Sequence, residues 1–497
     1  MGATQSTSTS ASNSISEKAV IEQQAVESLA QKVADLAVAD GPVSADGSLP
    51  LDLVKSWQES TQDDHKLRLA RTILAHSNIK NAIASPHVVV SDAHVFSLTI
   101  PFATGPVTNQ QSSGRCWLFA TTVRNVLRYH IMQALNLDNF QLSQSYLFFA
   151  DKFEKANHYL ELSIHHADKP LDSRLVCHLA TDPIGDGGQW DMARNLLEKY
   201  GVVPQAIYPE SYNSSNSGGI NSILTSRLRE MALTLRELSK GENAASVMRA
   251  RAVKEEFMAE IWKAMTVAMG APPQPDEKFT WDYKDKDGKV KSWEGTPREF
   301  YKAFTSKQYP ALEAFSLIND PRNDYGKLYT VEALGNIWGM RTIAYVNTES
   351  KRLKEAIVAC IRAGQPVFFG CDVGKFLDSP HGIMDLELYD FKNALGIKYG
   401  MTKEQRLRTG DSAMTHAMVI SGVHLDKDGN PVRYRIENSW GDFNGDKGYY
   451  VMTDRWFDEY VFQVVVPRQL AARDLVKVLD AGNPTVLPAW DPMGALA

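Results

Sequence analysis

A polar loop at residues 108–114 leads directly into an amphipathic helix, and a cysteine, Cys116, stands where the two meet. Apolar residues after it recur mostly at intervals of three and four, which predicts a helix with one buried face. The unpaired N–H groups at a helix start favour a thiolate, the attacking form of cysteine. A nucleophile also needs a base and donors for an oxyanion, so the fold must bring such groups to this helix end. Without such partners, a cysteine at a helix start is more often a small buried residue.

Candidate partners lie far downstream in the chain. His416 stands at the start of an alternating apolar strand, and Asn438 begins the run Asn-Ser-Trp-Gly. The imidazole can pair with the thiolate, and an asparagine carbonyl can accept the other ring N–H and hold the tautomer. Trp440 can shield that hydrogen bond from water. Gln110, on the polar loop, can donate a side-chain N–H to an oxyanion beside the backbone N–H of Cys116.

This set of residues resembles the active site of the papain-like cysteine peptidases. The resemblance rests on Gln110, the Gly-Arg-Cys-Trp run around Cys116, His416 before a small residue and a strand, and the Asn-Ser-Trp-Gly run at Asn438, all in the family's order. It implies that Cys116, His416, Asn438 and Gln110 are the catalytic residues.

A second short run, Gly-Asp-Gly-Gly, resembles the family's glycine-rich segment, whose backbone pairs with a substrate in an extended conformation. The resemblance implies that Gly187 and Gly188 in this run bind substrate, together with Trp440. Secreted members carry a cysteine in each of these neighbourhoods, where this chain has Ser113 and Asp186, so that disulfide cannot form.

The long separation between Cys116 and His416 points to the bleomycin hydrolase branch of this family, which the sequence resembles over nearly its whole length. Helical periodicity at 220–270 and a strand-turn-strand pattern at 279–293 supply the extra length as an insertion. The branch resemblance is carried by residues 109–120, 188–190, 366–375 and 491–497.

The predicted fold class is α+β: a papain-like two-lobe fold, with a helical lobe and a β-barrel-like lobe, a large helical insertion and a C-terminal arm. The continuous apolar run at 366–370 predicts a buried strand, and a turn at 426–429 joins the strands near His416 and Asn438. The predicted parts are a disordered N-terminal tail (1–16), an N-terminal helical arm (17–100), a papain-like left lobe with the nucleophile (101–219), a helical insertion with a small hairpin (220–345), a papain-like right lobe with the histidine and asparagine (346–470), and a C-terminal arm entering the active-site cleft (471–497).

Two further expectations concern local structure. Residues 17–80 have helical spacing, whereas Val88–Val90 and Phe96–Pro101 are predicted to be extended. The three cysteines other than Cys116 are expected in the core.

The last residues, 481–497, contain three prolines and two glycines, so they are predicted to form an extended arm. Composition alone favours a frayed tail. The resemblance implies instead that the arm fills the unprimed side of the cleft and that the carboxylate of Ala497 faces the ammonium group of the substrate. Two unit charges at about 4 Å attract by ~1 kcal/mol in water and by ~4 kcal/mol at an effective dielectric constant of about 20. An enzyme whose cleft is blocked in this way removes single N-terminal residues from peptides.

Charge and composition limit the other classes of function. Lys plus Arg total 53 against 59 for Asp plus Glu, and a net charge of -6 argues against a strongly basic nucleic-acid binder. Binding of single-stranded DNA or RNA, reported for some members of the family, is kept only as a secondary alternative. The four cysteines form no zinc-site spacing, and neither a metal nor a cofactor is predicted. No apolar run approaches the roughly 18 residues of a membrane span, so we predict no stable membrane association.

We predict a cytoplasmic location, because the N-terminus has no apolar region of a secretory signal. The first residues do match the myristoylation pattern, with Gly2 as acceptor, although one such chain binds membranes only marginally. A chance match in a flexible tail is the simpler interpretation. A mitochondrial form is a further alternative, against which stands the absence of arginine through residue 66.

The resemblance therefore implies a cytosolic cysteine aminopeptidase of the bleomycin hydrolase type, which trims peptides through a thioester. It further implies bleomycin amide hydrolysis, homocysteine-thiolactonase activity and assembly as a homohexamer. A papain-like endopeptidase with a disordered C-terminus is the alternative within enzymes.

Overall fold

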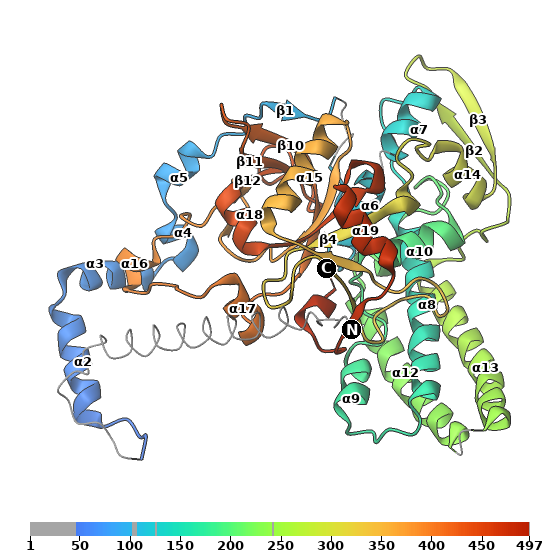
Figure 1. Ribbon diagram of the computed structural model, residues 1–497, viewed down its shortest axis with the longest axis horizontal. Helices are drawn as coiled ribbons and strands as arrows, with labels where there is room; N and C mark the ends of the chain where they lie inside the picture. The colour runs from blue at the N-terminus through green and yellow to red at the C-terminus, as the bar shows by residue number, and fades with distance from the viewer. Residues whose placement is uncertain (1–45, 102–106, 125–126, 241–242, 497) are drawn as a thin grey trace, which may run out of the picture. The chain divides into compact units, whose positions relative to one another are not determined.

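The structure, a computed structural model, describes residues 46–101, 107–124, 127–240 and 243–496 (Figure 1). Contacts divide the chain into two compact units, one formed by the residues up to Ile83 together with 391–397, and the other by the remainder. The predicted tail with Gly2 and the terminal Ala497 lie outside the described residues.

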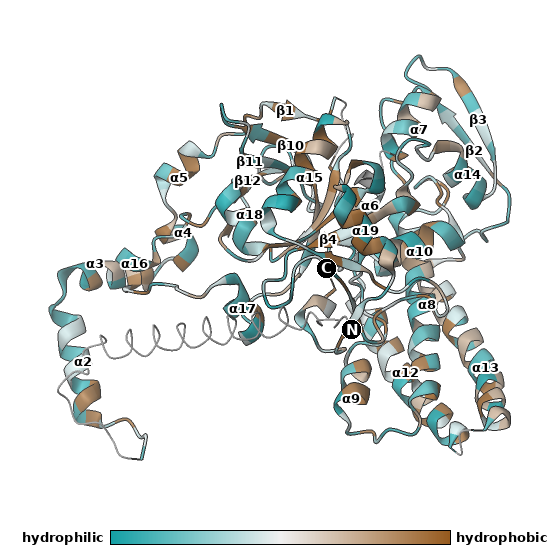
Figure 2. Cartoon of the chain, viewed as in Figure 1, coloured by the Kyte–Doolittle hydropathy of each residue, from teal (hydrophilic) through white to brown (hydrophobic). Residues whose placement is uncertain are grey.

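The smaller unit consists of short amphipathic helices. Neither α2 nor α3 buries a residue, and both expose large apolar side chains such as Leu51, Trp57 and Leu69. Hydrophobic and hydrophilic residues are mixed along both helices (Figure 2). The carboxylate of Asp64 caps α3 by accepting two backbone N–H groups. These helices confirm the helical prediction for the described part of residues 17–80. The helices are α2 (Leu51–Asp63), α3 (His65–Leu74), α4 (Ile79–Ile83) and α16 (Phe391–Leu395).

A long mixed sheet runs through the larger unit. Within the described residues its order is β14-β5-β6-β4-β13-β7-β10-β11-β12-β9-β8, and β1 pairs with β10. At its centre β10 lies between β7 and β11, antiparallel to both, with His416 opposite Cys371. The strands are β1 (Leu98–Thr99), β4 (Ala314–Ile318), β5 (Lys327–Val331), β6 (Tyr345–Asn347), β7 (Val367–Cys371), β8 (Leu377–Asp378), β9 (Ile383–Met384), β10 (His416–Leu425), β11 (Pro431–Glu437), β12 (Tyr449–Thr453), β13 (Val461–Pro467) and β14 (Thr485–Leu487).

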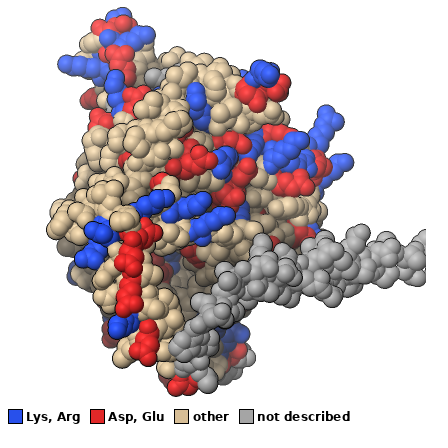
Figure 3. All heavy atoms as spheres, turned by 90° about the vertical axis from the view of Figure 1, so that its left-hand side faces the viewer, with Lys and Arg blue, Asp and Glu red and all other residues tan. Residues whose placement is uncertain are grey.

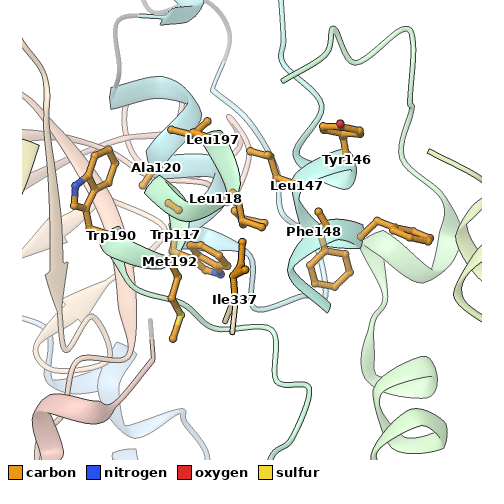
Figure 4. Close-up of a cluster of buried hydrophobic side chains, with 14 of the residues drawn as sticks. Trp117, Leu118, Ala120, Tyr146, Leu147, Phe148, Trp190, Met192, Leu197 and Ile337 are labelled. Carbon is orange, nitrogen blue, oxygen red and sulfur yellow. The ribbon is translucent and has the colours of Figure 1, made fainter. Parts of the chain in front are cut away.

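A helical lobe is built around α8, most of which is buried. The helices α12 and α13 lie along α8 (Figure 1), and side chains of α6, α8 and α10, including Trp117 and Trp190, share one buried cluster (Figure 4). The helices here are α6 (Cys116–Arg124), α7 (Leu127–Leu135), α8 (Gln144–His165), α9 (Arg174–Thr181), α10 (Trp190–Tyr200), α11 (Tyr212–Ser215), α12 (Gly218–Ser239), α13 (Ala244–Met269) and α14 (Pro297–Phe304).

A second buried cluster belongs to the sheet lobe. It includes Phe369, Cys371 and Met418 from the central strands, and α15 (Ser350–Arg362) packs against β10 and β13. The helices α17 (Lys403–Thr409), α18 (Asp454–Tyr460) and α19 (Arg473–Ala481) complete this lobe. A helical lobe joined to a sheet lobe confirms the predicted α+β class.

Several sequence predictions for single elements are confirmed. α12 and α13 occupy the predicted helical stretch, and β2 (Phe279–Lys284) pairs with β3 (Val290–Gly295) as a hairpin. β7 is the predicted buried strand, and β10 and β11 are joined across the predicted turn. None of the helices in the described ranges is long and apolar enough to cross a bilayer.

Two predictions were wrong. Val88–Val90 lie in a helix, α5 (Pro86–Ser91), because Pro86 at its first position fixes the backbone for a helical turn and outweighs the strand preference of valine. Cys177 is exposed on α9, whereas Cys360 and Cys371 are buried as expected. The spacing of apolar residues on so short a helix did not reveal which side faces solvent.

Candidate active site

The first turn of α6 meets the start of β10 at Cys116. The thiol is buried, with 2% of the residue exposed, and Sγ accepts the backbone N–H of Ala417 at 3.5 Å. Ala417 directly follows His416, so the helix start and the histidine strand are brought together. All four cysteines are free thiols.

The environment of Cys116 differs from the sequence expectation in one respect. Burial raises the pKa of the Cys116 thiol to about 11, although the N–H groups of Ala417, Trp117 and Cys116 itself act in the opposite direction. The helix start therefore does favour the thiolate, but the loss of water outweighs that contribution.

His416 is held in one tautomer by its neighbours. Its Nε2 lies 2.9 Å from Oδ1 of Asn438, and the same Oδ1 accepts the backbone N–H of Ser439 at 2.8 Å. Because that second bond fixes which atom of the amide is the oxygen, Nε2 must carry the ring proton. The neutral imidazole then has Nδ1 free as a proton acceptor.

The ring of His416 is covered by Trp440, whose centroid lies 4.8 Å away at an angle of 37°. The histidine is 4% exposed, and this burial lowers its pKa to about 4 despite the bond to Asn438. Trp440 thus shields the histidine–asparagine pair from water, in the position that the sequence analysis gave it.

Gln110 is tied to the asparagine loop rather than left free. Its Oε1 accepts the hydroxyl proton of Ser439 at 2.6 Å, and its backbone N–H donates to the Ser439 carbonyl at 2.8 Å. One N–H of Nε2 donates to the carbonyl of Ser113 at 2.6 Å, which leaves the second N–H for another acceptor. Ser439 was missed as a contributor, although it lies inside the Asn-Ser-Trp-Gly run.

The loop that carries Gly187 and Gly188 lies against the start of α6. A Cβ at Gly188 would come within 2.4 Å of the Trp117 indole, and one at Gly187 would come within 2.8 Å of Leu496 Cβ. Both positions therefore require glycine for close approach rather than for an unusual backbone angle. Gly187 and the C-terminal residue Leu496 are therefore close together.

Asp186 is a second residue whose role the sequence did not reveal. Its carboxylate accepts the backbone N–H of Gly114 at 2.9 Å and pairs with Lys152 at 2.7 Å. Ser217 and Asn221 donate to it as well. Burial alone would raise the pKa of Asp186, but Lys152 and these donors hold it well below its usual range.

The C-terminal segment is anchored along its length. Asp491 pairs with Arg322 at 2.8 Å, and Gln189 Nε2 donates to the Ala495 carbonyl at 2.6 Å. Trp490 stacks under the guanidinium of Arg174 at 4.1 Å. A cavity of about 350 Å³ adjoins the segment, and its lining includes Gly187, Leu496 and His158.

Metal-binding side chains and surface charges bear on the remaining classes of function. No group of three or more metal-binding side chains occurs in the portion of the chain that the structure describes. On the face shown in Figure 3, acidic and basic side chains are intermixed.

Comparisons with known proteins agree on one family. A family model described as the Peptidase C1-like family matches residues 48–494. Cysteine proteinase 1, mitochondrial, from Saccharomyces cerevisiae is 42% identical over 456 residues, covering 90% of this chain and 93% of the yeast protein. Aminopeptidase C from Streptococcus thermophilus is 40% identical, covering 90% of this chain and 99% of that protein.

Two further relatives extend the agreement to an animal protein and to a solved structure. Bleomycin hydrolase from Homo sapiens is 41% identical, covering 88% of this chain and 96% of the human protein. The crystal structure of PepW from Lactobacillus rhamnosis superimposes with a TM-score of 0.85 at 37% identity, covering 91% of this chain and all of that one. The chain therefore belongs to the Peptidase C1-like family of cysteine peptidases.

Proposed function

We propose that this protein is a cysteine aminopeptidase of the bleomycin hydrolase type, with peptides as substrates. The observation that carries the proposal is the close approach of Leu496 to Gly187, which supports an arm that occupies the unprimed part of the cleft. The names of the bacterial and human relatives, aminopeptidase C and bleomycin hydrolase, support the same activity.

In the proposed reaction His416 Nδ1 takes the proton of Cys116 as Sγ attacks the carbonyl carbon of the first peptide bond. The second N–H of Gln110 Nε2 and the backbone N–H of Cys116 receive the oxyanion. The imidazolium then gives its proton to the amine, the C–N bond breaks, and a thioester remains. Water, deprotonated by His416, attacks the thioester and restores the thiol.

Asn438 acts on the reaction through the histidine. Its Oδ1 accepts a hydrogen bond from Nε2–H throughout the reaction, so the imidazolium formed during attack keeps its orientation. Burial acts against the charged form of each group, because it raises the pKa of the Cys116 thiol and lowers the pKa of His416.

The C-terminal arm sets which peptides enter. Gln189, Arg322 and Gly187 support the arm up to Leu496. The next residue, Ala497, lies outside the described residues, and we propose that its carboxylate receives the ammonium group of the substrate. Only one residue then fits between the arm and Cys116, so cleavage removes single N-terminal residues.

The sharpest test compares a free and an N-acetylated alanyl coumarinylamide. An aminopeptidase cleaves the free form and leaves the blocked form nearly intact, whereas preference for the blocked form would identify an endopeptidase. Cys116→Ser should abolish cleavage of the free form while the far-ultraviolet circular dichroism stays unchanged. Full activity of that variant would contradict the role of Cys116.

The same site chemistry extends to two other substrates. A thioester-forming cysteine can open the amide of bleomycin and the thiolactone of homocysteine, and we propose both as further activities to be assayed on the purified protein.

The exposed apolar faces of α2 and α3 support self-association, which we propose as a homohexamer. Light scattering at a mass near 55.3 kDa, that of one chain, would contradict it.

Location and nucleic-acid binding stay proposals with less support. We propose a cytoplasmic location with a mitochondrial fraction; the name of the yeast relative supports only the mitochondrial fraction, and fractionation of cells tests both. The intermixed charges of Figure 3 give no support to a nucleic-acid surface on that face, and a gel shift that is absent at low salt would remove this role.

A further inference from the structure

Another cavity lies in the helical lobe, between α8, α9 and α12 (Figure 1). Its volume is about 510 Å³, within the range of about 300–1,000 Å³ that is usual for small-molecule sites. All its lining residues fall within 159–181 and 229–236, so the catalytic residues and the C-terminal arm do not contribute to it. The cavity is therefore a candidate site of its own.

The wall of this cavity is mostly apolar. Leu162 of α8, Val176 of α9 and Leu233 of α12 all contribute to it. Leu233 is 52% exposed, and Leu171, another lining residue, is 55% exposed. An alkyl chain that covers these side chains gains the hydrophobic free energy of removing them from water.

Two arginines, Arg229 and Arg236, line the same cavity from one face of α12, since residues seven positions apart share a side of a helix. Arg236 is buried. Neither arginine forms an ion pair within the described residues, and no Asp or Glu lines the cavity there. The two acidic residues of α12, Glu230 and Glu237, pair with other cations. Because arginine is rarely buried without a paired charge, the cavity carries positive charge that no carboxylate of the chain neutralises.

The two guanidinium groups are held by backbone carbonyls at helix ends. Arg229 donates to the carbonyls of Ala180 at 2.8 Å and Thr181 at 2.9 Å, at the end of α9. Arg236 donates to the carbonyl of His166 at 2.8 Å, at the end of α8. The C-terminus of a helix carries about half a negative charge, so these contacts offset only part of each positive charge. The carbonyls also use only some of the N–H donors of each guanidinium.

Tyr159 shows that both charges act on the cavity that it lines. Burial raises the pKa of its phenol, whereas a hydrogen bond with Ser163 and the positive charges of Arg229 and Arg236 act in the opposite direction. Both guanidinium groups are therefore close enough to stabilise an anion at this place.

We propose that this cavity binds a long-chain carboxylate, with the alkyl chain against the apolar wall and the carboxylate on Arg229 and Arg236. The planar guanidinium matches a carboxylate through paired N–H donors. A mostly apolar cavity with a few charged groups at one side is the usual form of a site for such a ligand. The inference is independent of the proposed peptidase function, so a failure of the peptidase assays does not affect it.

The binding test uses titration calorimetry on the full chain with dodecanoate. Acetate has the charge without the chain, and dodecyltrimethylammonium has the chain with the opposite charge. Each should bind about tenfold more weakly than dodecanoate, or weaker still, because the site requires both features. Equal binding of the cationic and the anionic amphiphile would contradict the proposal.

Cys177 reports whether the ligand occupies this cavity. Its thiol is an exposed part of the lining, with Sγ 3.3 Å from the Leu171 carbonyl, whereas the other three cysteines are buried. Dodecanoate should slow the reaction of Cys177 with N-ethylmaleimide about fivefold, and acetate should not. Mass spectrometry of the tryptic peptide 175–194 measures this reaction apart from the other cysteines. Unchanged labelling with dodecanoate bound would overturn the assignment to this cavity.

Arg229→Gln should weaken dodecanoate binding about tenfold, because it removes a charge-assisted hydrogen bond. Arg227→Gln is the matched control on the same helix, since Arg227 pairs with Glu230 and Glu260 and does not line the cavity. It should leave the affinity unchanged. Leu233→Glu is a second variant at an exposed position of the lining, and like-charge repulsion should weaken binding there too if Arg229→Gln does not fold. Equal affinities of the folded variants and the control would overturn the proposal.

Discussion

His416 Nε2 and Asn438 Oδ1 lie 2.9 Å apart, and the N–H of Ser439 fixes the direction of that bond. The asparagine is placed one residue after β11 and the histidine at the first residue of β10, so the antiparallel pairing of these strands sets the distance. The pairing of β10 with β11 therefore holds the imidazole in its orientation.

The first prediction concerns that orientation. Asn438→Ala should lower kcat for an aminoacyl amide by about 10²-fold, because the ring loses the acceptor that holds Nε2 protonated and general acid–base catalysis contributes about 10²–10⁴. KM should change little, since Asn438 does not line the path of the substrate. Steady-state kinetics measure both constants, and a large rise of KM with unchanged kcat would contradict the role.

The second prediction is a dependence of stability on pH. The pKa of His416 falls from 6.5 to about 4 on folding, so between these values the unfolded chain binds more protons than the folded one. Stability from this group is therefore present above pH 6.5 and is lost as pH falls towards 4, by about 3 kcal/mol in all. Urea unfolding at several pH values, compared with His416→Ala, isolates the effect, and parallel curves would contradict it.

The third prediction concerns Asp186. Asp186→Ala should lower the free energy of unfolding by about 3–5 kcal/mol, because it leaves the fully buried Lys152 without its counter-charge. Asp474→Ala is the control, since Asp474 pairs with Arg352 at an exposed site where an ion pair contributes little. Equal losses in the two variants would show that the buried network has no special weight.

The fourth prediction tests the close approach of Gly188 to α6. Gly188→Ala puts a methyl group within 2.4 Å of the Trp117 indole and should cost about 1–3 kcal/mol through overpacking. Gly218→Ala, at the start of α12, meets no atom within 4 Å and should be neutral or slightly stabilising. Thermal unfolding of both variants distinguishes the two sites.

The fifth prediction concerns the anchor of the arm. Asp491→Ala removes the contact with Arg322, so the arm should leave the cleft more often and cleavage of a blocked substrate should rise about fivefold. Asp480→Ala, on α19 before residues 481–497, removes a surface pair with Arg468 and should leave cleavage of the blocked substrate unchanged. Unchanged cleavage of the blocked substrate in Asp491→Ala would contradict the gating role of this pair.

Much of the site could be predicted because it is local in sequence. A cysteine at the start of a helix and a histidine at the start of a strand are visible in single runs of residues. The distance between Cys116 and His416 along the chain did not hide them, because each motif has its own hydrophobic pattern. The α+β class was predicted from the resemblance to papain-like peptidases that these motifs carry.

What the sequence hid depends on contacts between distant segments. The thiol of Cys116 was expected to ionise, but the sequence cannot show how completely Ala417 and its neighbours exclude water from Sγ. Asp186 gave no signal of its four partners, which come from the polar loop, α8, α12 and the residue just before α12. The helix at Val88–Val90 shows the reverse case, where a proline at the first position overrides a run of strand-forming residues.

The carboxylate of Asp186 has a consequence for how such an enzyme tolerates its surroundings. A sulfur nucleophile works only while reductants keep it from oxidation. Those same reductants would open a cleft wall closed by a disulfide. Here the segment of Asp186 is held by an ion pair and hydrogen bonds, which a reductant cannot break, and all four cysteines are free. Reductants that protect the catalytic thiol from oxidation therefore leave the contacts of Asp186 intact.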